Sequence, residues 1–70
     1  MNWMIDPDTK YKYVISDTHS YFIGLFSGKY KLSIVNNKTK KEKVFNLFNK
    51  DEFFVEKEAE TIIDREAQLV

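Results

Sequence analysis

The sequence contains no cysteine, one histidine, one proline and two glycines among its 70 residues. Without cysteine there is no disulfide and no thiolate ligand, and a single histidine excludes the usual zinc fingers. The two glycines, Gly24 and Gly28, do not form a phosphate-binding loop. No apolar run approaches the ~18 residues of a membrane-spanning helix, and no basic segment precedes an apolar one at the N-terminus. These absences predict a soluble, cytoplasmic protein with no metal, no cofactor and no membrane contact.

The composition is that of a small folded domain. Apolar residues make up 43% of the chain and aromatic residues 16%, which is enough to form a core. A chain of this length buries only ~60% of its unfolded surface, so a single core is marginal. We therefore expect one domain spanning residues 1–70, stabilised further by a partner or a second copy.

Turn-forming residues divide the first two thirds of the chain into short strands. Apolar and polar residues alternate over 10–16 and 29–36, whereas 20–26 is apolar on both faces, as in a central strand. The stretches "DTH", "SG" and "NNKT" between these segments favour turns, and 41–47 follows as the next strand. The pattern predicts an antiparallel meander of four to five strands, the optional one being Trp3 to Ile5.

Two assumed pairings place the apolar side chains together. If Ser16 lies opposite Ser20, and Phe26 opposite Lys29, nine apolar side chains share one face of the sheet. These nine are Tyr11, Tyr13, Ile15, Tyr21, Ile23, Leu25, Tyr30, Leu32 and Ile34. The register of the last strand stays open.

The final third predicts a helix over about residues 50–67. Asn49 is positioned to cap it, with Glu52 reaching back as in a capping box. An apolar stripe follows at helical spacing and is expected to cover the nine-residue face: Val55, Ala59, Ile62 and Leu69, flanked by Phe54 and Ile63. The fold class is therefore α+β, with one C-terminal helix packed on one face of the meander.

The charges are sorted along the chain although its net charge is zero. Residues 29–50 carry a net charge of +6 and residues 51–70 a net charge of −5. Four acidic residues follow one another at i, i+4 on the predicted helix, where each like-charged pair costs ~0.2–0.5 kcal/mol. We call Glu52, Glu56, Glu60 and Asp64 the acidic row. With only Lys57 and Arg65 near enough to relieve it, the row is either a solvated face or a contact surface for a partner protein with a basic surface.

The opposite face of the sheet offers a second candidate surface. In the assumed register it carries Lys10, Lys12, Phe22, Phe26, Lys29 and Lys31. With Gly24 leaving open space, these residues would form a stacking platform for single-stranded nucleic acid. The competing interpretation is that Phe22, Phe26, Val14 and Val35 are covered by the N-terminal strand or by a second copy, as in a homodimer.

The sequence gives little support to catalysis. Ser16, Asp17, His19 and Ser20 lie within five consecutive residues, whereas a catalytic triad needs groups that converge from different elements. We therefore interpret the segment as a turn and expect no catalytic residues.

Two functional hypotheses remain. The first is a non-enzymatic protein-binding module that presents the acidic row, in the manner of a phage- or mobile-element-type inhibitor. Small, lysine-rich chains without cysteine occur among phage-encoded inhibitors of host enzymes, although no motif ties this chain to one family. The second is a single-stranded nucleic-acid binder that uses the lysine and phenylalanine face. A neutral chain lacks the basic excess typical of the second class, so the first is preferred.

Overall fold

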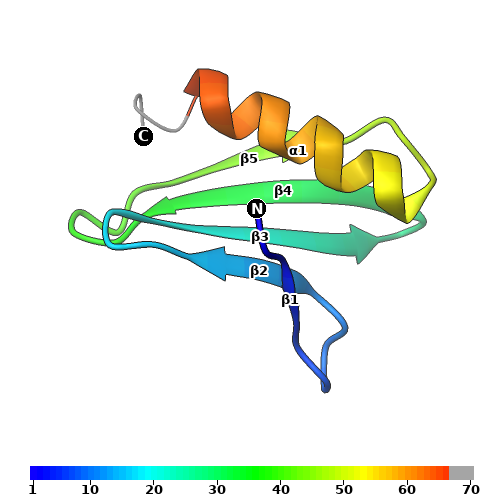
Figure 1. Ribbon diagram of the computed structural model, residues 1–70, viewed down its shortest axis with the longest axis horizontal. Coiled ribbons are helices and arrows are strands. Elements are labelled where there is room, and N and C mark those ends of the chain that lie inside the picture. The colour runs from blue at the N-terminus through cyan, green and yellow to red at the C-terminus, as the bar shows by residue number, and fades with distance from the viewer. Residues whose placement is uncertain (67–70) are drawn as a thin grey trace.

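The sheet and the helix follow the order of the chain. The computed structural model describes residues 1–66. Its elements are β1 (Met4–Ile5), β2 (Lys12–Ile15), β3 (His19–Phe26), β4 (Lys29–Asn36), β5 (Glu42–Asn46) and α1 (Glu52–Glu66). Consecutive strands pair antiparallel, and α1 lies along one face of the sheet (Figure 1). The predicted α+β class, with a five-stranded meander and a C-terminal helix, is confirmed.

The central hairpin has the predicted register. Phe26 pairs with Lys29, and the ladder continues through all eight residues of β3 and β4. Leu32 and Ile34 are completely buried between the sheet and α1. Around them the core contains Tyr21, Ile23, Leu47, Val55, Ala59, Ile62 and Ile63. Val55, Ala59, Ile62 and Ile63 therefore cover the sheet as expected, whereas the predicted flanking residue Phe54 is exposed. Leu69 lies outside the described residues.

The register of β2 was predicted wrongly by one residue. Ile15, not Ser16, pairs with Ser20. The Ser16 N–H donates to the His19 carbonyl over 2.8 Å, so the loop contains two residues, Asp17 and Thr18, instead of three. A shift of one residue moves every β2 side chain to the other face.

This shift redistributes the predicted core. Lys12 and Val14 face α1, whereas Tyr13 and Ile15 lie on the opposite face of the sheet. Asn37, from the next loop, holds the short turn in place. Its side-chain amide donates to the Ser16 carbonyl over 2.8 Å, and its oxygen accepts from the Ser20 hydroxyl over 2.6 Å.

The cap of the helix lies two residues later than predicted. The Asp51 carboxylate accepts the Phe53 N–H at 2.9 Å, and the Asp51 carbonyl accepts the Val55 N–H as the first helical bond. Asp51 is therefore the N-cap. Asn49 instead donates its side-chain amide to Glu58. The predicted Asn49–Glu52 capping box does not form.

Two turns at the ends of the sheet share one local design. Asp6 accepts the N–H groups of Asp8 and Thr9, and Asn36 accepts those of Lys38 and Thr39 in the same way. Each turn closes through a lysine with positive φ, 66° at Lys10 and 65° at Lys40. The two N–H donors hold the pKa of Asp6 below its ordinary value.

The N-terminal segment reaches over the same face as α1 (Figure 1). Trp3 is partly buried against the core, and its ring N–H donates to Glu60 over 3.0 Å. Among residues 1–66, no helix is long and apolar enough to cross a membrane.

Candidate protein-binding surfaces

The acidic row finds cations within its own chain. Lys12 forms ion pairs with Glu56 and, at 4.0 Å, with Glu52. Glu60 accepts the Trp3 ring N–H and lies 3.5 Å from the N-terminal ammonium. Asp64 is exposed. The expectation that only Lys57 and Arg65 relieve this row was wrong, because the β2 shift brings Lys12 to the helix.

The acidic row consequently helps to attach the N-terminal half of the chain to α1. Lys12 is largely shielded, with 15% of its side chain exposed, and Glu56 is half-buried. An ion pair at this depth is screened less by salt than a surface pair. The charges of Glu56 and Glu60 are therefore partly neutralised within the chain, whereas Glu52, with 73% of its side chain exposed, is neutralised less.

The sheet face turned away from α1 has no cover among the described elements. We call it the open face. By register it carries Tyr13, Ile15, Phe22, Phe26, Lys29, Lys31, Ser33, Val35, Glu42 and Val44. Phe22, Phe26, Lys29 and Lys31 are thus brought together as predicted. Lys12 and Val14 lie on the other face, and Lys10 lies in the turn between β1 and β2.

The space above Gly24 is filled and does not form a stacking slot. The Phe26 and Tyr11 rings meet edge to face, with centroids 5.4 Å apart. A Cβ atom on Gly24 would lie 2.8 Å from Phe26 and 3.0 Å from Tyr11. The glycine therefore accommodates two protein rings, and the predicted nucleic-acid platform loses both its open space and two of its four lysines, Lys10 and Lys12.

The outer edge of β5 is a second surface that lacks a partner in the described part of the chain. The Asn36 N–H donates to Lys41 and the Leu47 N–H donates to Tyr30, which fixes the alternation of the ladder. Lys43 and Phe45 therefore bond inward to β4. The N–H and C=O groups of Glu42, Val44 and Asn46 point outward, along an edge that no other described strand occupies.

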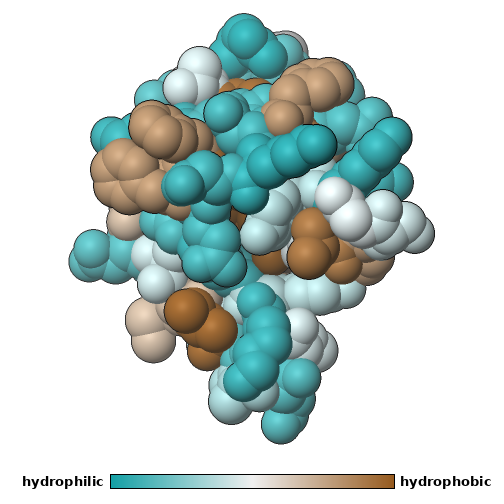
Figure 2. Space-filling model, turned by 90° about the vertical axis from the view of Figure 1, so that its right-hand side faces the viewer, coloured by the Kyte–Doolittle hydropathy of each residue, from teal (hydrophilic) through white to brown (hydrophobic). Residues whose placement is uncertain are grey.

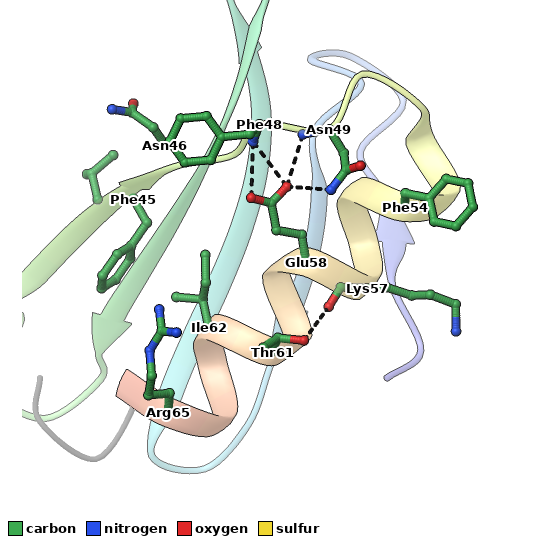
Figure 3. Close-up of a pocket in the computed structure, with 11 residues that line it drawn as sticks. Phe45, Asn46, Phe48, Asn49, Phe54, Lys57, Glu58, Thr61, Ile62 and Arg65 are labelled. Carbon is green, nitrogen blue, oxygen red and sulfur yellow. Dashed lines mark hydrogen bonds between the residues drawn. The ribbon is translucent and has the colours of Figure 1, made fainter.

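A groove of about 710 Å³ runs between this edge and α1 (Figure 3). We call it the β5 groove. The strand side contributes Val44, Phe45, Asn46, Phe48 and Asn49, and the helix side contributes Phe54, Lys57, Glu58, Thr61, Ile62 and Arg65. In Figure 3, Phe45 and Ile62 approach each other at its base, whereas Phe54 and Lys57 point outward. The groove therefore has an apolar base and a charged rim.

Glu58 fixes the wall at one end of the β5 groove. Its carboxylate accepts the backbone N–H groups of Phe48 and Asn49, and the Asn49 amide, at 2.9–3.1 Å (Figure 3). Burial of this carboxylate raises its pKa, but the hydrogen bonds from Asn49 and Phe48 outweigh burial and hold the pKa of Glu58 below its ordinary value. Glu58 is thus already fully engaged by the β5–α1 connection.

The two ends of the β5 groove differ in chemistry. One end carries Lys43 and Arg65, which both pair with Glu66 at 3.8 and 3.2 Å and leave a net positive charge. The lysines of the β4–β5 turn extend this basic end. The other end carries Phe48 and Phe54, which are exposed.

The aromatic end continues onto the tip of the molecule. Phe53 and Phe54 meet edge to face at 5.5 Å, and Lys57 lies 5.0 Å above the Phe53 ring. Phe48 is 83% exposed. Figure 2 shows this end of the molecule, where hydrophobic side chains form several separate groups among hydrophilic ones.

The segment considered for catalysis forms a turn. The Ser16 hydroxyl donates to the His19 carbonyl at 2.9 Å, and the His19 ring stacks on Tyr21 with centroids 6.2 Å apart. Among residues 1–66, no three His, Cys, Asp or Glu side chains are close enough together to hold a metal ion.

Sequence reasoning missed the β5 groove. The apolar residues Val44, Phe45 and Phe48 lie on both faces of the last strand, and this ambiguity prevented a register assignment. A useful signal was present, because the last strand of a meander that ends in a helix is an edge strand. The sequence did not indicate that α1 would leave this edge accessible.

Comparison with known proteins finds no matching family model, no matching curated protein and no matching solved structure. Functional inference therefore depends on the surfaces described above.

Proposed function

We propose that this chain is a non-enzymatic protein-binding module that captures an extended segment of a partner along the outer edge of β5. The observation that carries the proposal is the row of outward backbone groups at Glu42, Val44 and Asn46 beside the β5 groove. Unpaired strand edges bind extended polypeptides through main-chain hydrogen bonds, and adjacent pockets select the side chains.

The β5 groove defines the chemistry of the captured segment. In an added strand every second side chain points toward α1, where Phe45 and Ile62 form an apolar base. Apolar residues are therefore expected at alternate positions. Acidic residues are expected beside Lys43 and Arg65, because these cations, with the turn lysines, exceed the negative charge of Glu66. Inhibition follows if the partner needs the captured segment for its own activity.

This surface replaces the acidic row as the proposed contact. Lys12, Trp3 and the N-terminal ammonium already engage three of the four carboxylates. The edge of β5 has donors and acceptors left over, and a partner strand satisfies them without breaking any contact within residues 1–66. Binding of a protein partner thus remains the proposal, with a different surface.

Val44→Pro tests the proposal most directly. The Val44 N–H points away from β4, so proline removes an outward donor and leaves the β4–β5 ladder intact. Val44→Ala is the matched control, because it trims the side chain and keeps the donor. Selection of short random peptides on the wild-type chain should enrich alternating apolar residues with acidic residues at one end. Val44→Pro should weaken the binding of these peptides about tenfold, whereas Val44→Ala should weaken it much less.

Three results would overturn this function. In the first, the selection enriches no peptide. In the second, the enriched peptides bind Val44→Pro as tightly as Val44→Ala. In the third, they leave the amide signals of Glu42, Val44 and Asn46 unchanged in nuclear magnetic resonance spectra.

A further inference from the structure

The open face carries several exposed apolar side chains that no described element covers. Ile15 is 64% exposed and Val44 52%, and Phe26 is 45% exposed at the other side of the same face. Phe22 and Val35 lie between them and are only partly buried. Apolar side chains gathered on one uncovered face are typical of contacts with another protein surface.

We infer that the open face is the interface of a homodimer, in which two copies pack sheet against sheet. The strands contain 2, 4, 8, 8 and 5 residues, 27 in all. At ~3.3 Å along a strand and ~4.8 Å between strands, they span about 430 Å² of flat face. Two faces therefore bury about 860 Å² in total, which is below the ~1,000 Å² of a stable specific interface and in the range of weak, reversible ones.

A small interface of this kind is typical of weak, reversible association, so we expect the dimer to dissociate fully on dilution. The chain also gains from it, because a 70-residue domain without disulfides buries too little surface alone to be more than marginally stable.

The charges on the open face indicate how the copies align. Lys31 lies at one end of the face, and Glu42 lies at the other, on the far side of the row formed by Tyr13, Phe22, Ser33 and Val44. A two-fold axis along this row, perpendicular to the strands, superposes the two rows. It also exchanges the ends, so Glu42 of one copy lies near Lys31 of the other, and the reverse pair forms by symmetry.

The same axis places both β5 edges on one side of the dimer, running antiparallel. Each edge remains free, because the interface uses side chains of the open face and not the backbone edge. The dimer would then present two β5 grooves to one partner, and linked binding raises the apparent affinity. This last consequence depends on the proposed function, whereas the dimer does not.

Sedimentation of the whole chain across the micromolar range tests the dimer. The wild type should change from monomer to dimer with concentration. Ile15→Lys should raise the dissociation constant about tenfold or more. Leu25→Lys is the matched control, because Leu25 is also about half exposed, at 53%, but lies on the face that carries α1. It should leave the dissociation constant unchanged, and circular dichroism should show that both variants fold.

A charge exchange tests the alignment. Glu42→Lys and Lys31→Glu should each weaken the dimer, and the double variant should restore it. The inference is overturned if the wild type stays monomeric. It is also overturned if Leu25→Lys weakens the dimer as much as Ile15→Lys does, or if the double variant forms a weaker dimer than either single variant. Binding of oligothymidylate that Lys31→Glu abolishes would instead assign this face to nucleic acid. Ile15→Lys should still bind the selected peptides at each β5 edge, so failure of the dimer is distinguishable from failure of the proposed function.

Discussion

The two faces of the sheet are built from alternate residues of the same strands, but only one of them is covered. On the covered face Leu32 and Ile34 are completely buried. On the open face Val44, which is of similar character and lies one strand away, is half exposed. The difference arises because residues 1–66 contain one helix, and that helix, together with Trp3, occupies a single face. Strand sequence sets which residues share a face, and the rest of the chain decides which face becomes the core.

The comparison also shows where a charge is tolerated. The covered face contains Lys12, which pairs with Glu56 and Glu52 at the margin of α1. The open face carries Lys29, Lys31 and Glu42, which have no described partner across the sheet. Charge on the covered face is therefore used within the monomer, whereas charge on the open face is free to orient a second molecule.

The largest expected effect is the loss of a core side chain from the covered face. Leu32→Ala removes a completely buried side chain and should lower the free energy of unfolding by about 2–5 kcal/mol. Val44→Ala on the open face should cost about 1 kcal/mol or less, since half of its side chain is already exposed. Denaturant unfolding at a concentration where the chain is monomeric measures both. Equal losses would mean that the open face is covered in the monomer.

The second effect concerns the helix that makes the covered face. Asp51→Ala removes the acceptor of the Phe53 N–H and should cost about 1 kcal/mol. Asp51→Asn is the matched control, because it keeps a capping oxygen and removes the charge, and it should change the midpoint of thermal unfolding little. A loss as large as that of Asp51→Ala would show that Asp51 acts through its charge and not as the cap.

The smallest effect is a dependence of the free energy of unfolding on pH in the acidic range. Glu58 has a pKa held below its ordinary value of 4.5, so its ionised form is favoured in the folded chain. Its contribution is therefore present above the unfolded pKa and is lost as pH falls through the lower, folded pKa. The free energy of unfolding should decrease below about pH 4.5, and Glu58→Gln should flatten that part of the profile. An identical acid profile in Glu58→Gln would contradict the role of the Phe48 and Asn49 hydrogen bonds.

The sequence predicted those features that depend on neighbouring residues. The β3–β4 register followed from a two-residue turn at Ser27 and Gly28, whose φ values of 53° and 78° match the conformation that such turns need. The helix followed from apolar spacing, which is a property of 15 consecutive residues. In both cases the physical determinants lie within one hairpin or one helix.

The tertiary structure alone decided the features that join distant residues. In β2, Tyr13 and Ile15 share one face, and Lys12 and Val14 share the other. The alternation defines these two faces, but it does not show which of them packs against α1. Asn37, which is 21 residues from Ser16, holds the shorter turn that selects the face, and Glu56, 44 residues from Lys12, accepts the lysine that this choice turns inward. The free edge of β5 arises in the same way, because α1 packs over the core and leaves a groove beside the last strand. The sequence by itself thus determined the elements and their order, while non-local hydrogen bonds, ion pairs and helix packing determined which surfaces remain for a partner.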